Sequence, residues 1–167
     1  MADTSSFDIT SPVDFAEVDN ALNQARKEIG QRYDFKGVTA EITLDTTAKT
    51  LTLLTDDEMK MNALWEMVQG RLTRRGVPVK NFKNEKGSEA AAGSKVRRVL
   101  TIQEGIPIEA AREIVKFIKD KKFKKVQASI QGDQVRVTSP SKDELQLAMQ
   151  HLRGHDFGVS LSFGNYR

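Results

Sequence analysis

Apolar and polar residues alternate on both sides of a two-residue turn in the stretch 126–138. The turn is Gly132-Asp133, and Gly at the first of two turn positions favours a type II′ turn. Period-two alternation around such a turn is typical of a β-hairpin. One face of this hairpin is aliphatic, and the other is polar, carries Arg136 and is open to water or a ligand. The aliphatic positions are Val126, Ala128, Ile130, Val135 and Val137.

Similar patterns divide the rest of the chain. Alternating segments predict strands over 6–9, 38–44, 50–53, 77–82, 96–102 and 159–163. Apolar residues three or four positions apart predict helices with buried stripes over 18–29, 64–72, 111–118 and 145–152. Ser11 is the expected N-cap of the first helix and Gly30 its expected end. Ser141 and Glu144 form the expected capping box of the last helix.

The predicted elements follow the order βαββαβ twice, so each half of the chain is one supersecondary unit. Split βαβ units of this kind form a four-stranded antiparallel sheet with two helices on one face. We therefore predict an α+β protein, a tandem of two ferredoxin-like domains. Residues 84–94 are polar and contain two Gly, which predicts a mobile linker or long loop between the halves.

Composition excludes several classes of protein. The chain has no Cys, which rules out disulfides, thiolate zinc sites and a Cys nucleophile. No apolar run approaches the roughly 20 residues of a membrane helix, and residues 1–6 do not resemble a secretory signal. We expect a cytoplasmic protein that does not contact the membrane.

Sequence motifs give little support for an enzyme. There is no phosphate-binding glycine loop and no Gly-x-Ser-x-Gly elbow. His151 and His155 are four residues apart, but no third metal ligand accompanies them, and a closed zinc site needs four. Asp56 and Asp57 are better explained as helix caps. We expect no catalytic residues, no metal and no cofactor.

The segment Arg32–Gly37, with the sequence RYDFKG, is the first candidate binding site. Tyr33 and Phe35 lie between the cations Arg32 and Lys36. A nucleotide clamp would stack a base on a ring and hold phosphate with the two cations. The alternative is a connection between helix and strand whose aromatic side chains fill the core.

Nucleic-acid binding is the second candidate function. RNA-recognition modules stack bases on aromatic residues of their central strands, whereas the strands expected in the middle of these sheets have no outward aromatic residue. Hydrogen bonding and phosphate contact through Thr101 and cationic side chains stay open. The cations of this alternative are Arg97, Lys116, Lys119, Lys121, Lys122, Lys124 and Lys125; the lysines also suit a solvated helix end.

Several stretches together resemble the YajQ family of small bacterial proteins, and the resemblance covers nearly the whole chain. These stretches are Phe7–Ile9, Val18–Ala21, Arg32–Gly37, Ile114–Asp120, Ile130–Thr138 and Asn165–Arg167.

The resemblance implies a tandem of RNP-like ferredoxin folds whose first strands are exchanged between the halves. Strand 96–102 would complete the first domain, 11–104, which includes the segment 84–94. Residues 1–10 would complete the second domain with 105–167. Family members are described as nucleotide-binding proteins, and some as cyclic-di-GMP effectors acting on transcription. The resemblance implies no catalytic residues.

We therefore expect a non-enzymatic sensor of a purine nucleotide (GTP or ATP) or of cyclic-di-GMP, acting through a macromolecular partner such as a transcription regulator. Direct RNA, tRNA or DNA binding is the alternative, and a third possibility is an adaptor whose open sheet faces another protein. The oligomeric state stays open. Arg32, Lys36, Arg136 and Arg167 would contact phosphate. Tyr33 or Phe35 would stack on a base, and Gln131 and Asp133 would contact base edges or shape the hairpin turn.

Overall fold

The computed structural model describes residues 4–167, which divide into two compact units. The unit Val13–Gln103 is called the 13–103 unit. Residues up to Pro12 join Glu104–Arg167 in the second, which is called the 104–167 unit. Both contain an antiparallel sheet and helices, so the predicted α+β class is confirmed.

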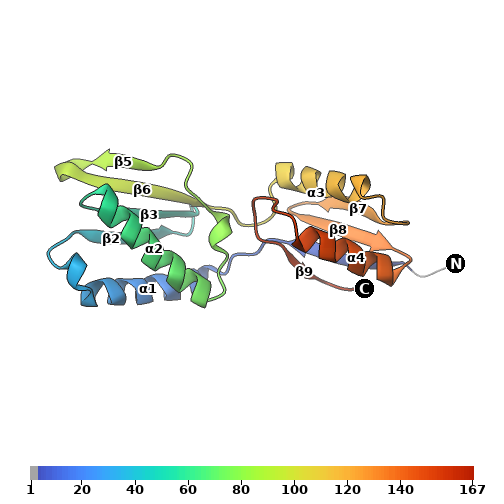
Figure 1. The fold of residues 1–167 in the computed structure, drawn as a ribbon, viewed down its shortest axis with the longest axis horizontal. Coiled ribbons are helices and arrows are strands. Elements are labelled where there is room, and N and C mark those ends of the chain that lie inside the picture. Colours follow the sequence, from blue (N-terminus) through green and yellow to red (C-terminus); the bar gives the residue numbers. More distant parts are fainter. Residues whose placement is uncertain (1–3) are drawn as a thin grey trace. The chain divides into compact units, whose positions relative to one another are not determined.

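In the 13–103 unit, helices α1 and α2 pack on one face of a five-stranded sheet (Figure 1). The strand order is β2-β3-β6-β4, and β5 pairs with β6 beside β4. The helices are α1 (Phe15–Gln31) and α2 (Glu58–Arg74), and the strands are β2 (Ala40–Asp45), β3 (Thr50–Thr55), β4 (Phe82–Lys83), β5 (Ser88–Ala91) and β6 (Lys95–Ile102).

In the 104–167 unit, helices α3 and α4 cover a four-stranded sheet with the order β7-β8-β1-β9. Strand β1, from the start of the chain, lies between β8 and β9, and Asp8 stands opposite Arg136. The helices are α3 (Ile108–Asp120) and α4 (Lys142–Arg153), and the strands are β1 (Ser5–Thr10), β7 (Gln127–Gln131), β8 (Gln134–Ser139) and β9 (Ser162–Gly164).

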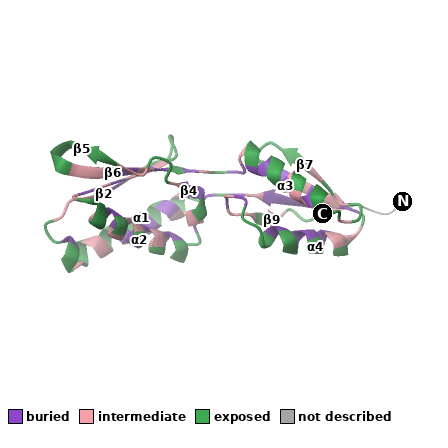
Figure 2. Cartoon of the chain, turned by 45° about the horizontal axis from the view of Figure 1, so that its top comes forward, coloured by how far each residue is buried: buried purple, intermediate pink, exposed green. Residues whose placement is uncertain are grey.

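Alternation along the strands decides which side chains enter each core (Figure 2). Leu51 and Leu53 of β3 are fully buried against α1 and α2, while the intervening Thr52 faces outward. Val135 and Val137 of β8 are buried in the same way beneath α3 and α4. The apolar rows are therefore covered, and each sheet keeps one polar face.

Two expected helix boundaries are wrong. Asp14, not Ser11, is the N-cap of α1, because its carboxylate accepts the backbone N–H groups of Ala16 and Glu17. The helix also continues through Gly30 to Gln31. Ser141 caps α4 as expected by accepting the N–H of Glu144, but the Glu144 carboxylate accepts the N–H of Lys124 instead of closing a capping box.

Three expected segments also need correction. The segment 84–94 is not free of regular structure, because β5 pairs with residues Lys95–Arg98 of β6. The strand expected over 77–82 is mostly a 3-10 turn, Val79–Asn81, followed by β4. The last strand is β9, at 162–164, because only these residues pair with β1.

Candidate functional site

A hollow of about 510 Å³ lies where α1 passes into β2. Its lining runs from Ile29 to Ala40, and the turn Tyr33–Phe35 is a short 3-10 helix. This turn brings Arg32, Tyr33, Phe35 and Lys36 to one place, so the structure gathers four of the residues that the sequence proposed as a clamp.

The two aromatic residues of the turn have opposite environments. Tyr33 is 88% exposed, whereas Phe35 is 4% exposed and packs in the core of the 13–103 unit. Phe35 lines the hollow but offers little ring surface to a base, because most of its side chain is buried in this core. Tyr33 remains the stacking candidate of this segment.

The charges around the hollow are partly compensated. Arg32 binds Asp34 through two hydrogen bonds, from Nε at 2.9 Å and from Nη2 at 2.7 Å. This pair raises the pKa of Arg32 and lowers the pKa of Asp34. Lys36 lines the same hollow and adds a second cation beside this pair.

Lys60 also belongs to this cluster, although the sequence did not indicate it. Its Nζ donates to the backbone carbonyl of Asp34 and lies 5.3 Å from the centre of the Phe35 ring. The Arg32 guanidinium approaches the same ring at 5.7 Å. Lys60 comes from the first turn of α2, where its position in the helical pattern predicts only an exposed residue.

Gln131, Asp133, Arg136 and Arg167 all lie in the 104–167 unit but do not form one cluster. Gln131 is the last residue of β7, and Asp133 is the second residue of the turn that joins β7 to β8. The backbone of Arg167 pairs with Ser6, which stands opposite Thr138 near the other end of β8. Asp133 and Arg167 therefore lie near opposite ends of β8, and Arg136 lies between them on that strand.

Arg136 is engaged with Asp8 on the polar face of the sheet. Its Nε donates to Asp8 Oδ1 at 2.9 Å, and Asn165 Nδ2 donates to Oδ2 at 2.6 Å. The Asp8 side chain is 7% exposed. The two donors hold the pKa of Asp8 below its ordinary value, so much of the Arg136 charge is already neutralised.

Asp8→Asn is expected to lower the free energy of unfolding at pH 7 by about 1–2 kcal/mol. Because folding lowers the Asp8 pKa, its stabilisation is present above the unfolded-state value and is lost as pH falls below about 4. The difference between wild type and variant should narrow in that acid range. Urea unfolding at pH 7 and pH 3 measures it, and a difference that widens in acid would contradict the assigned pair.

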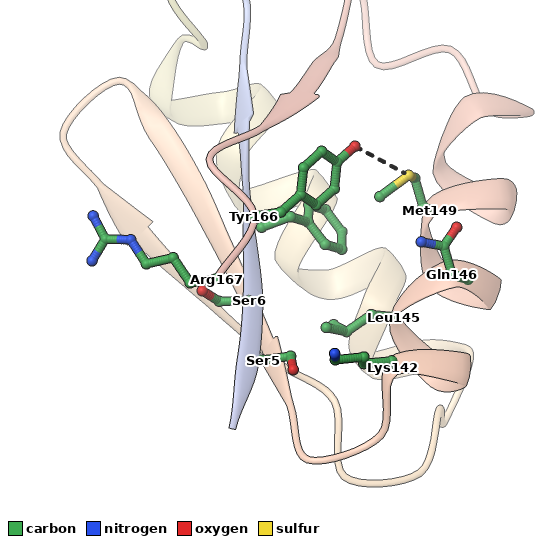
Figure 3. Close-up of a pocket in the computed structure, with 9 residues that line it drawn as sticks. Ser5, Ser6, Lys142, Leu145, Gln146, Met149, Tyr166 and Arg167 are labelled. Atoms are coloured by element: carbon green, nitrogen blue, oxygen red, sulfur yellow. Dashed lines mark hydrogen bonds between the residues drawn. The ribbon is translucent and has the colours of Figure 1, made fainter. Parts of the chain in front are cut away.

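The chain end beside Arg167 borders an apolar hollow of about 290 Å³ between β1 and α4 (Figure 3). Phe7, Leu145 and Met149 contribute to its walls. The Tyr166 hydroxyl lies 3.3 Å from the carbonyl of Phe163 and 3.9 Å from Met149 Sδ. In Figure 3 the Arg167 guanidinium points away from α4, so it does not supply charge to this hollow.

The residues of the nucleic-acid alternative fall into two separate groups. The six lysines lie on α3 and in the turn that follows it, whereas Arg97 lies on β6 of the other unit. Lys121 Nζ is 5.3 Å from the Phe117 ring centre. Cations at the end of α3 also offset the negative end of the helix dipole, which accounts for part of the cluster.

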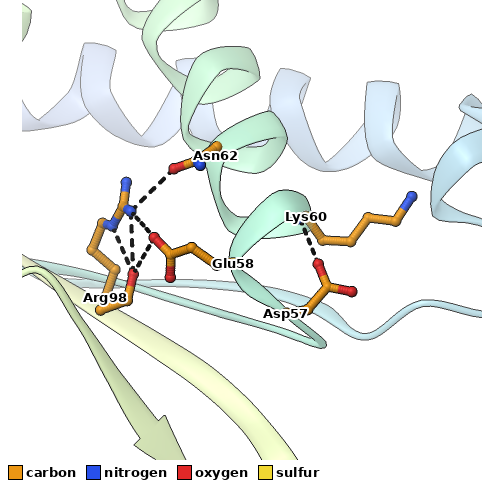
Figure 4. A network of polar contacts seen from close by, with 6 residues as sticks. Asp57, Glu58, Lys60, Asn62 and Arg98 are labelled. Atoms are coloured by element: carbon orange, nitrogen blue, oxygen red, sulfur yellow. Dashed lines mark hydrogen bonds and ion pairs between the residues drawn. The ribbon is translucent and has the colours of Figure 1, made fainter.

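A buried arginine forms a network that the sequence did not predict (Figure 4). Arg98 alternates with Val96 and Leu100 and therefore faces the helices, where its side chain is 9% exposed. Its Nη2 donates to Glu58 Oε1 at 2.9 Å, to Ser88 Oγ at 3.2 Å and to Asn62 Oδ1 at 3.3 Å. The network ties β5 and β6 to α2. The Arg98 charge therefore serves to hold these elements together.

The histidines lie against aromatic rings. The ring centre of His155 lies 4.5 Å from that of Phe157 and 4.9 Å from that of Phe117, with the rings tilted in both pairs. The ring centre of His151 lies 5.4 Å from that of Phe123. Within residues 4–167, no three His, Asp or Glu side chains are grouped so as to hold a metal ion. No helix of this described part has the length and apolar character needed to cross a membrane.

Comparison with known proteins gives one consistent result. Residues 5–167 match the family model described as nucleotide-binding protein YajQ-like. A protein of Trichlorobacter lovleyi, named as a nucleotide-binding protein, is 46% identical over 97% of this chain and 98% of its own length. Proteins with the same description from Koribacter versatilis and Elusimicrobium minutum are 48% and 46% identical over the full chain, covering 99% and 100% of their lengths.

Proposed function

Because the chain belongs to the family of YajQ-like nucleotide-binding proteins, we propose that it binds a purine nucleotide or cyclic-di-GMP in the hollow beside Arg32–Gly37. It acts as a non-enzymatic sensor that passes the signal to a macromolecular partner. The observation that carries this proposal is the exposed Tyr33 at the rim of a hollow that is also lined by Arg32 and Lys36.

Each side chain of the hollow has a role in this proposal. Tyr33 offers a largely exposed ring to a base, and Lys36 offers an ammonium group to phosphate. Arg32 keeps its planar donor group in place through Asp34, and phosphate would share or replace that carboxylate. Phe35 supports the turn from below, with Lys60 at its ring.

The residues of the other unit have secondary roles. Gln131 and Asp133 read base edges or shape the hairpin turn, and Arg136 and Arg167 contact phosphate. Arg136 would have to share its guanidinium with Asp8, which makes it the weaker of the two cations. Any of these contacts would form a site separate from the hollow.

We further propose that each unit is an RNP-like ferredoxin fold and that the two first strands are exchanged, with domains 11–104 and 1–10 plus 105–167. The pairing of β1 with β8 and β9 supports this, as does the pairing of β6 with β3 and β4. Exchange of these strands would link the two domains at two places, because the chain would pass from one domain to the other twice.

Calorimetric titration with GTP, ATP, cyclic-di-GMP and a short single-stranded RNA, each at two salt concentrations, tests the function. We expect micromolar binding of one small nucleotide that weakens only modestly with salt. Failure of all three nucleotides to bind would contradict the sensor.

Direct binding of RNA or DNA is the second candidate, supported by the six lysines gathered at the end of α3. This function predicts an affinity that falls steeply between low and moderate salt, because bound cations release counterions from the nucleic acid. RNA binding alone, with that salt dependence, would favour this candidate over the sensor.

A further inference from the structure

We propose that two copies of this chain associate by antiparallel pairing of their β7 strands, which joins two four-stranded sheets into one. Strand β7 is the edge of its sheet, next to β8. An uncovered edge offers a row of unpaired N–H and C=O groups and is a template for another strand. The proposed interface is independent of the nucleotide hollow, which lies in the other unit.

The hairpin geometry decides which backbone groups are available. Gln131 stands opposite Gln134 across the two-residue turn, so these two residues form a hydrogen-bonded pair. Hydrogen-bonded and non-bonded pairs alternate along an antiparallel ladder. Ala128 and Ile130 are therefore in non-bonded pairs with β8, and their N–H and C=O groups point toward the open side.

The other long edge strand is protected, and β7 is not. On β2, the Ile42 carbonyl accepts a hydrogen bond from Arg26 Nη2 at 2.7 Å, and Glu41 and Asp45 add charge. By contrast, β7 has the uncharged sequence QASIQ, without Pro. Proteins usually protect edge strands with charge, Pro or a covering side chain. Of the two long edge strands in the described chain, β7 lacks the charged side chains that β2 carries.

The sequence of β7 is self-complementary about Ser129. With the twofold axis at that residue, Ala128 of one copy faces Ile130 of the other, and both expose the backbone groups needed for a bonded pair. The apolar row then continues across the two sheets, and Ile130, 37% exposed as it stands, becomes covered. Gln127 faces Gln131 in the polar row.

Charge complementarity favours a second copy over an unrelated strand. The same register brings Lys125, just before β7, to the end where Asp133 of the other copy lies. Two opposite-charge pairs result, one at each end of the joined strands. Lys125 and Asp133 are both exposed in the single chain. The paired strands themselves carry no charged side chain, so the pairing places no like charges opposite one another.

Sedimentation equilibrium of the full chain over a wide concentration range tests the pairing. We expect a monomer–dimer equilibrium, and Ala128→Pro should weaken dimerisation at least tenfold, because it removes an outward N–H without removing a bond to β8. Circular dichroism checks that the variant stays folded. A chain that is monomeric up to millimolar concentration, or a dimer that Ala128→Pro leaves intact, overturns the proposal.

Charge reversal tests the register, and circular dichroism checks that each variant stays folded, because the Asp133 side chain lies close to Gly105. Lys125→Asp and Asp133→Lys should each weaken the dimer several-fold, and the double variant should restore it. Lys122→Asp is the matched control, since it makes the same charge change farther from the partner's Asp133, and it should have a smaller effect. Equal effects of Lys122→Asp and Lys125→Asp, or no recovery in the double variant, overturn the register about Ser129.

Discussion

Phe7→Ala is expected to lower the free energy of unfolding by about 3–5 kcal/mol, the usual cost of truncating a buried aromatic residue. Phe7 of β1 is 1% exposed and stands opposite Val137 of β8. Its ring makes an edge contact with Phe163 at 5.7 Å and lies 6.5 Å from Tyr166. A cavity there would remove contacts from β1, β8 and the chain end together.

Urea unfolding of the full chain, followed by circular dichroism, measures this loss. Tyr33→Ala is the matched control, because it removes an aromatic side chain that is 88% exposed and should change stability by less than about 0.5 kcal/mol. If Phe7→Ala does not fold, Phe7→Leu should cost about 1 kcal/mol. A loss below 1 kcal/mol for Phe7→Ala would contradict the position of β1 in this core.

Gly105→Ala has the second large expected effect, a destabilisation of about 2–4 kcal/mol. The Gly105 backbone has φ +84°, where a side chain costs about 1 kcal/mol or more. A Cβ there would lie 2.4 Å from Asp133 Oδ2 and 2.9 Å from Asp133 Cβ, and such overlap adds about 1–3 kcal/mol. Backbone hydrogen bonds from Gly105 to Ser11 and from Ile106 to Asp133 hold the two segments in place.

Two variants separate the backbone cost from the overlap. Gly76→Ala has a similar φ of +74° but open space around it, so thermal or urea unfolding should show only the backbone cost. Combining Gly105→Ala with Asp133→Gly removes the overlapping side chain and should recover part of the loss. If Gly105→Ala and Gly76→Ala cost the same, the close approach of Asp133 is not as described.

Most of the fold follows from periodicity because strands with one covered face must alternate. Val135 and Val137 are buried where alternation placed them, beneath α3 and α4. The sequence did not predict strand β5, because its residues are mostly polar or small. The strand is stabilised by its pairing with β6 and by the contact between Arg98 and Ser88. Neither interaction has a local sequence signal.

The candidate site could be located from the sequence but not resolved in detail. Tyr33 and Phe35 are two residues apart in a 3-10 turn, and no periodic pattern tells which ring is buried. Lys60 joins them from α2 through a tertiary contact. The engagement of Arg136 with Asp8 depends on β1 lying beside β8, a pairing between residues far apart in the chain.

The most direct test of nucleotide binding at the hollow is calorimetric titration of wild type and Lys36→Glu with the nucleotide that binds wild type. Lys86→Glu is the control, since it makes the same charge change outside the lining of the hollow. The proposed clamp predicts at least a tenfold loss of affinity for Lys36→Glu and little change for Lys86→Glu. Equal affinity of all three proteins would contradict a nucleotide site beside Arg32–Gly37.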